Sequence, residues 1–211
     1  MGAAGAARTV RGMISRSTSD EPPQEFTRAL EQLRSVRLRP EVVLSEVPAP
    51  QRIAPYAVAL TADVLGRFDP ATQDEPDELA SGRFVLLHDP AGPEPWDGTF
   101  RAVTFVRAEL EPEMGADPML GEVGWSWLLE SLAAHDALHT QDGGTVTRVL
   151  SQSFGALADR PATVKLEVRG SWTPLGDDLG LHLHGWADLL CTVAGLPPLP
   201  EGVTALPGRR R

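Results

Sequence analysis

The chain has 211 residues, of which 42% are hydrophobic, and a formal net charge of −10. A chain of this length and composition can bury one sizeable core, so a single domain with tails is the simplest organisation. We predict a disordered tail over residues 1–22, a single α+β domain over residues 23–195 and a Pro/Arg-rich tail over residues 196–211. Met13 is an alternative to Met1 as the translation start.

The charge is unevenly distributed along the chain. The two tails hold six Arg and three acidic residues, which leaves 13 basic and 26 acidic residues, a balance of −13, in residues 23–195. An acidic body repels phosphate backbones, so we expect no nucleic-acid binding through the folded domain. The same charge favours a basic partner, and we expect that partner to be another protein.

Other function classes are excluded by what the sequence lacks. No apolar run is long enough to span a bilayer, and no signal peptide is recognisable, so we expect a cytoplasmic protein that does not enter membranes. Cys191 is the only cysteine, which excludes a disulfide framework and a cysteine metal knuckle. The chain also has none of the common nucleotide-binding, hydrolase or metalloprotease motifs, and we expect no cofactor.

The predicted elements begin with a helix over residues 23–38, in which Phe26, Leu30 and Leu33 recur at helical spacing. Residues 39–109 predict four strands, with an acidic loop at residues 66–80 and a Pro/Gly-rich turn at residues 89–98. These strands cover residues 41–47, 56–64, 83–88 and 99–109. A helix ending near His135, strands over residues 145–154 and 162–172, and a helix ending near Gly195 complete the order.

The strand over residues 162–172 has the clearest pattern. Its apolar side alternates with a polar side, which is typical of an antiparallel strand with one solvated face. The apolar side comprises Val164, Leu166, Val168, Gly170 and Trp172. The strand over residues 99–109 predicts the same core-facing side for Ala102, Thr104, Val106, Ala108 and Leu110.

The second half of the sequence repeats itself. Residues 105–133 match residues 167–194, beginning with Val106 and Arg107 on Val168 and Arg169. After one deletion the match continues through the helices, where Gly124 and Trp125 align with Gly185 and Trp186. The sequence therefore predicts an internal ββα duplication about a pseudo-twofold axis, within the order α-β-β-β-β-α-β-β-α. The fold class is α+β, with five or six antiparallel strands and the helices on one face.

Glycine inside a helix costs roughly 1 kcal/mol relative to alanine, so Gly124 and Gly185 need a compensating role. Our hypothesis is that the two helices cross at this pair, with Trp125 and Trp186 filling the space on either side. The two Trp residues could flank a ligand pocket, but aromatic residues at helical spacing usually belong to a core.

His182 and His184 are the main candidates for chemistry, because the other copy has Gly121 and Val123 in their place. Asp178 and Asp188 each lie four residues from one of these histidines. This asymmetry favours a proton-transfer or ligand site near Trp125 and Trp186; the alternative is a pair of hydrogen-bonded structural histidines.

The metal hypothesis is weaker. His135 and His139 have the i, i+4 spacing that places two imidazoles on one metal, but the metalloprotease glutamate is absent and a helix C-terminus also favours histidine. The acidic loop lacks the residue order of a calcium site. Cys191 lies on an apolar helical stretch, which favours a buried, unreactive thiol.

The stretches GEVGWSWLLESL, VKLEVRGSWTP and LGLHLHGWADLL resemble an actinobacterial family known as domain of unknown function 3000. The resemblance covers about residues 24–200 and implies a cytoplasmic protein without an assigned activity. It supplies no catalytic residues to carry over.

Two functions remain open on this evidence. The first is a non-enzymatic binding or adaptor module with an acidic surface, favoured by the lack of a catalytic constellation. The second is a small-molecule-binding protein or enzyme whose site lies between the repeat helices. Burial distinguishes the two: a wet cleft at His182 and His184 favours a ligand, whereas a filled core favours the adaptor. The oligomeric state is not predicted.

Overall fold

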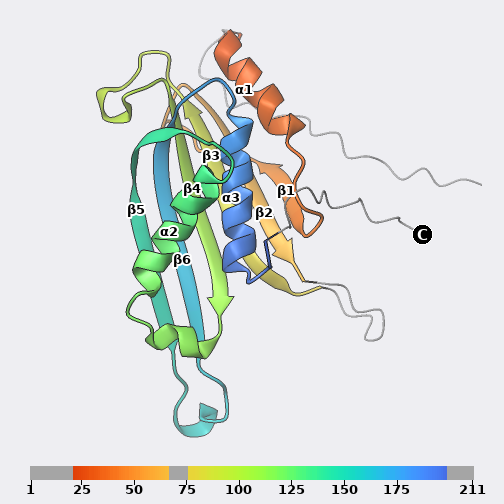
Figure 1. Ribbon diagram of the computed structural model, residues 1–211, viewed down its shortest axis with the longest axis vertical. Helices are drawn as coiled ribbons and strands as arrows, with labels where there is room; N and C mark the ends of the chain where they lie inside the picture. Colours follow the sequence, from red (N-terminus) through yellow and green to blue (C-terminus); the bar gives the residue numbers. More distant parts are fainter. Residues whose placement is uncertain (1–20, 67–75, 199–211) are drawn as a thin grey trace, which may run out of the picture.

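The computed structural model describes residues 21–66 and 76–198, and within them the fold is α+β (Figure 1). The predicted tails fall mostly outside these residues, as does most of the acidic loop. The elements of the described part follow the predicted order. They are α1 (Gln24–Ser35), β1 (Val42–Val47), β2 (Tyr56–Leu65), β3 (Glu78–His88), η1 (Glu94–Trp96), β4 (Phe100–Leu110), η2 (Pro112–Ala116), α2 (Leu120–Ala133), β5 (His139–Ser151), η3 (Gly155–Leu157), β6 (Thr163–Pro174) and α3 (Gly180–Val193).

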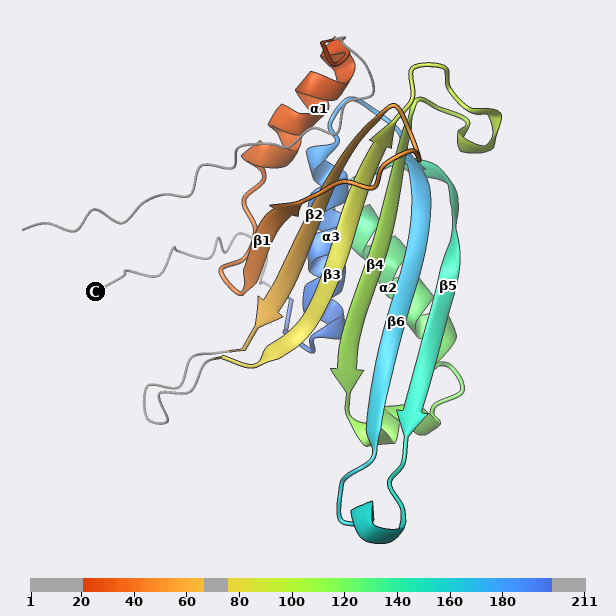
Figure 2. The same ribbon diagram turned by 180° about the vertical axis from the view of Figure 1, so that it is seen from behind.

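The six described strands form one antiparallel sheet in the order β1-β2-β3-β4-β6-β5. The three α-helices lie on one face of this sheet (Figure 1), and the reverse view shows the other face without a helix (Figure 2). The segment between β1 and β2 crosses one end of this second face, which we call the open face. There Ala49 and Ala54 pack with Ala59, Val85 and Leu87 in a small second core.

Two strands differ from their predicted bounds. β3 begins at Glu78, five residues before the expected start, and pairs with both neighbours from Ala80 onward. Its first residues, ELASG, have few of the β-branched or aromatic side chains that mark a strand. β5 runs from His139 to Ser151 rather than over residues 145–154, because a register shift between Thr140 and Gly143 interrupts the sequence pattern without ending the strand.

The alternation predicted for β4 and β6 is confirmed. In β6 the residues Val164, Leu166, Val168, Gly170 and Trp172 are buried beneath the helices, while Lys165 and Arg169 are exposed. In β4 the corresponding positions from Ala102 to Ala108 are buried. The sheet thus has one face in the core and one in solvent, as antiparallel sheets commonly do.

Strand pairing supports the internal duplication. Val106 and Val168, which match in the sequence repeat, lie directly opposite each other in the β4–β6 ladder. An antiparallel pair whose equivalent residues face each other has a local twofold axis through that pair. The axis relates β3, β4 and α2 to β5, β6 and α3.

The two copies exchange their helices. α2 follows β4 in the chain but packs on β5, whereas α3 follows β6 and packs on β3 and β4. The two helices also contact each other over the middle of the sheet (Figure 1). Each copy therefore covers the strands of the other.

The predicted helix contact at Gly124 and Gly185 is found at Gly185 and is wrong for Gly124. A Cβ added to Gly185 would lie 3.0 Å from the Leu132 Cα and the Ser131 carbonyl oxygen, so Gly185 is where α3 approaches the α2 backbone. A Cβ on Gly124 would instead meet Val146 of β5 at 3.2 Å. The contact is offset along α2 because Gly124 faces the sheet.

Candidate functional site

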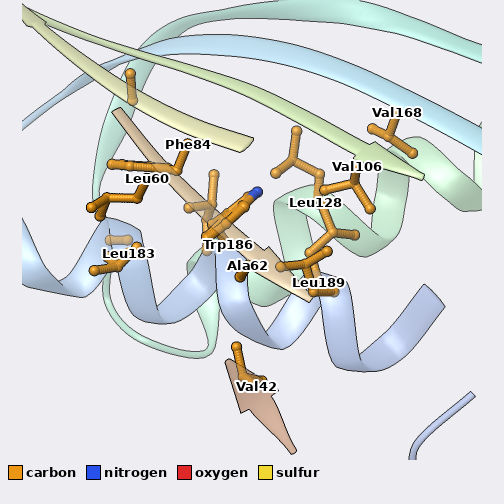
Figure 3. Packing of buried hydrophobic residues seen from close by; sticks show 14 of the residues in the cluster. Val42, Leu60, Ala62, Phe84, Val106, Leu128, Val168, Leu183, Trp186 and Leu189 are labelled. Carbon is orange, nitrogen blue, oxygen red and sulfur yellow. The ribbon is translucent and has the colours of Figure 1, made fainter. Parts of the chain in front are cut away.

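The two repeat Trp residues do not share a pocket. Trp186 is fully buried among the core side chains (Figure 3), with its ring 5.6 Å from that of Phe84 and over Gly82 of β3. Trp125 is half-buried and lies over Gly144 and Gly170, the paired glycines of β5 and β6. Each indole thus fills space left by glycine in the sheet, which is a packing role.

His182 is also part of the core, with 1% of its surface exposed. The Trp172 Nε1–H donates a hydrogen bond of 3.1 Å to His182 Nδ1. Because Nδ1 accepts, the neutral ring carries its proton on Nε2. Burial lowers the pKa of His182 to about 4, and the neighbouring His139 acts in the same direction. The ring is therefore neutral at physiological pH and acts as an acceptor for Trp172.

His184 lies outside the core and belongs to a different cluster. Its ring stacks on that of His135 at 5.2 Å, and His135 Nε2 lies 2.7 Å from Asp188 Oδ2. Burial lowers the pKa of His184, and His135 lowers it further, while Asp188 and Asp178 oppose the shift. The histidines and Asp188 join the end of α2 to α3, so the predicted pairing of Asp188 with His184 is replaced by a bond to His135.

The predicted metal pair is not on one helix. α2 ends at Ala133, Asp136 adopts a left-handed φ of 52°, and His139 is the first residue of β5. His139 Nδ1 lies 2.9 Å from the Ala137 carbonyl oxygen, while His135 bonds to Asp188. Within residues 21–66 and 76–198, no three His, Cys, Asp or Glu side chains are grouped so as to hold a metal ion.

Asp178 and Asp117 have the same local role in the two copies. Each carboxylate accepts a hydrogen bond from the backbone N–H two residues later, Gly180 and Met119 respectively, just before the helix begins. Asp178 therefore precedes α3 and does not lie on its surface four residues below His182. Both residues form a turn before the helix, whose N-cap residues are Met119 and Leu179.

A candidate surface that the sequence did not predict lies on the open face. A shallow depression of about 440 Å³ lies over β3, β4, β6 and β5. Its lining includes two arginines and no carboxylate, although the chain as a whole is acidic. The lining residues are Arg83, Val85, Val103, Thr104, Phe105, Gly143, Gly144, Thr145, Arg169, Gly170 and Ser171.

Arg83, Phe105 and Arg169 form one row across this depression, because the register places them opposite one another on β3, β4 and β6. The Arg169 guanidinium carbon lies 4.7 Å from the centre of the Phe105 ring, a cation–π distance. Arg83 Nη2 donates to the Pro48 carbonyl oxygen at 2.9 Å, and Arg169 Nη2 donates to Glu167 at 3.1 Å. Each guanidinium has five N–H donors, so most remain available to a bound anion.

The depression extends to the β5 bulge, since Gly143 is one of its lining residues. A Cβ on Gly143 would meet no atom within 4 Å, so an open space replaces the side chain there. Arg101 holds the bulged segment by donating to Gln141 O, Ser171 Oγ and Thr173 Oγ1. Of these acceptors, Ser171 belongs to the lining of the depression. Burial lowers the pKa of Arg101, whereas Asp142 acts in the opposite direction.

One signal for this surface was present in the sequence. The polar side of the predicted strands carries Arg83, Arg101 and Arg169. The strand order was not predictable from the sequence. β4 and β6 are neighbours in the sheet, although β5 lies between them in the chain.

Comparison with known proteins gives a family but no activity. A family described as "Protein of unknown function (DUF3000)" matches residues 22–204. The chain matches no curated protein and no solved structure significantly. Within the described residues, no helix is both long and apolar enough to cross a membrane.

Proposed function

The chain belongs to the DUF3000 family of proteins of unknown function, and we propose that it is a non-enzymatic binding module that docks a partner protein on the open face. The observation that carries this proposal is the depression beside Phe105, which combines an apolar floor with two arginines on a face that no described helix covers. Aromatic and Arg side chains are the residues most enriched at energetically important positions of protein interfaces.

The site between the repeat helices has less support. The predicted wet cleft would need Trp186 and His182 at its wall, but both side chains are fully packed in the core. His184 and His135 are half-buried, and the stacking of the two rings with the hydrogen bond from His135 to Asp188 links the helices rather than forming a pocket. By the criterion of burial, the adaptor is the better-supported function.

The proposal is tested by affinity capture with a charge-reversed open face. Wild type, Arg83→Glu/Arg169→Glu and a control Arg28→Glu/Arg34→Glu are used to capture proteins from the source organism's lysate, quantified by mass spectrometry. The control makes the same charge change on the exposed surface of α1. We expect a partner that wild type and control retain and the open-face variant loses, by at least about tenfold.

Folding of each variant is checked by thermal unfolding before capture. The captured protein is then produced in pure form and its affinity for all three chains is measured by titration calorimetry. A partner that binds the three folded chains equally would place docking elsewhere, and the absence of any partner specific to the wild type would contradict the adaptor function.

A further inference from the structure

The lining of the depression has a charge opposite to that of the chain, although Glu167, just outside the lining, pairs with Arg169. The formal net charge is −10, yet the row through Phe105 contains two arginines and the depression lining has no Asp or Glu. A rim of this kind attracts carboxylates and repels basic segments. The net charge alone favours a basic partner, but the local surface favours an acidic one.

We propose that the depression binds an extended acidic segment of the partner protein, in which an apolar residue is flanked by two acidic ones in the pattern acid–x–apolar–x–acid. This inference rests on the proposed docking function and names the chemistry of the partner. The apolar side chain occupies the floor over Val85 and Val103, beside Phe105, and the carboxylates pair with Arg83 and Arg169.

The spacing of the two arginines sets the pattern. β3 and β6 lie on either side of β4, so their backbones are about 10 Å apart. In an extended peptide, residues i, i+2 and i+4 point to the same side, and the outer two are about 13 Å apart. Long Arg side chains bridge the remaining difference, and the i+2 residue then falls over Val85 and Val103, beside the Phe105 ring on which Arg169 stacks.

The geometry of the guanidinium group explains why Arg83 and Arg169 can bind carboxylates. Arg presents a planar fork that can hold a carboxylate through two parallel hydrogen bonds. Arg83 is held by one hydrogen bond to the Pro48 carbonyl oxygen and Arg169 by an ion pair with Glu167, and both forks keep further N–H donors. Stacking on Phe105 further restrains Arg169, so less side-chain freedom is lost on binding.

The test is a selection from a random dodecapeptide display library on the immobilised full-length chain, with a parallel selection from the same library on Arg83→Glu/Arg169→Glu. We expect enrichment of acid–x–apolar–x–acid sequences. A fluorescein-labelled peptide of the consensus is then titrated by anisotropy against wild type, each single Arg→Glu variant and Arg107→Glu. Arg107 is exposed on β4 of the same face but outside the depression lining.

The expected result is a loss of at least about tenfold in affinity for Arg83→Glu and for Arg169→Glu, and a change below about twofold for Arg107→Glu. Affinity should also fall as salt rises. If a reversed arginine unfolds the chain, the corresponding Arg→Gln variant replaces it, with a smaller loss in the same direction.

The contrary outcomes separate this inference from the proposed function. Enriched peptides that are basic or uncharged, but still lose binding when the arginines are reversed, would overturn the acidic pattern and leave the docking surface standing. Peptides that bind the reversed variant as well as the wild type would contradict the docking surface itself.

Discussion

At the scale of single residues, His182 shows how a sequence asymmetry can be structural. It replaces Gly121 of the other copy, and its ring occupies the core as the acceptor for Trp172 Nε1. A buried acceptor for an indole N–H avoids the cost of leaving that donor without a partner. Sequence reasoning found the residue but could not tell a buried imidazole from an accessible one.

The lowered pKa of His182 predicts that the folded chain loses stability in acid. Its pKa is about 4 in the folded chain and near 6.5 in an unfolded one, so only the unfolded state gains this proton between those values. Its stabilising effect is therefore complete above pH 6.5 and is lost as pH falls toward 4, by on the order of 3 kcal/mol. Burial lowers the pKa of His88 and His184 as well, so they contribute in the same direction.

The measurement is the free energy of unfolding in urea at pH values from 7.5 to 4.5 for wild type and His182→Asn. The Asn oxygen can still accept from Trp172 but does not titrate, so this variant should be less stable at pH 7.5 and lose less stability on acidification. Parallel curves for the two chains would show that His182 does not carry the acid sensitivity.

The burial of Cys191 predicts that its thiol reacts with a reagent only when the chain unfolds as a whole. It is 4% exposed, and burial raises its pKa to about 11. At pH 8 the folded chain should react with a disulfide reagent at least about a hundredfold more slowly than the urea-unfolded chain. In the folded chain the reagent cannot reach the buried sulfur, and the raised pKa leaves very little of the reactive thiolate. A fast reaction of the native chain, followed by absorbance, would mean that α3 opens locally.

At the scale of elements, the contact between α2 and α3 depends on one glycine more than on the other. Gly185→Ala puts a Cβ 3.0 Å from backbone atoms of α2, which cannot move without displacing the helix. We expect a loss of about 2 kcal/mol in unfolding free energy, even after the gain in helix propensity. Gly124→Ala meets the Val146 side chain instead, which can rotate, so its net change should stay within about 1 kcal/mol.

Urea denaturation of both Ala variants measures this difference. The comparison is internally controlled, because each substitution has the same intrinsic effect on a helix. Equal losses for the two variants would contradict the offset contact and favour the symmetrical crossing expected from the sequence.

Element order and core faces were predictable, whereas neighbours across the sheet were not. The apolar alternation of β6 gave the buried side from Val164 to Trp172, and the repeat gave the twofold relation. The start of β3 was missed because its small residues carry little strand signal. The row of Arg83, Phe105 and Arg169 was missed because it depends on long-range register, which local pattern does not contain.

At the scale of the whole molecule, the exchange of helices predicts that neither copy folds alone. A fragment ending at residue 136 has α2 but lacks β5 and β6 beneath it, and a fragment starting at residue 137 has α3 without β3 and β4. We expect each fragment to be unfolded by circular dichroism and an equimolar mixture to regain native secondary structure, because the missing apolar partner is then supplied in trans.

The wild-type chain is the reference for this reconstitution, and a mixture in which the second fragment carries Gly185→Ala is the matched control. The control mixture should assemble more weakly, since the same helix contact is perturbed. A first fragment that folds cooperatively by itself would contradict the dependence of each copy on the other.

The pairing of Val106 with Val168 also bears on how such a chain can evolve. Two identical subunits must carry every new side chain twice, once on each side of their axis, and both positions must tolerate it. A single chain holding both copies is released from that constraint. His182 and His184 can therefore stand in one copy where the other has Gly121 and Val123, and Trp172 has its buried acceptor without a second histidine being required in α2.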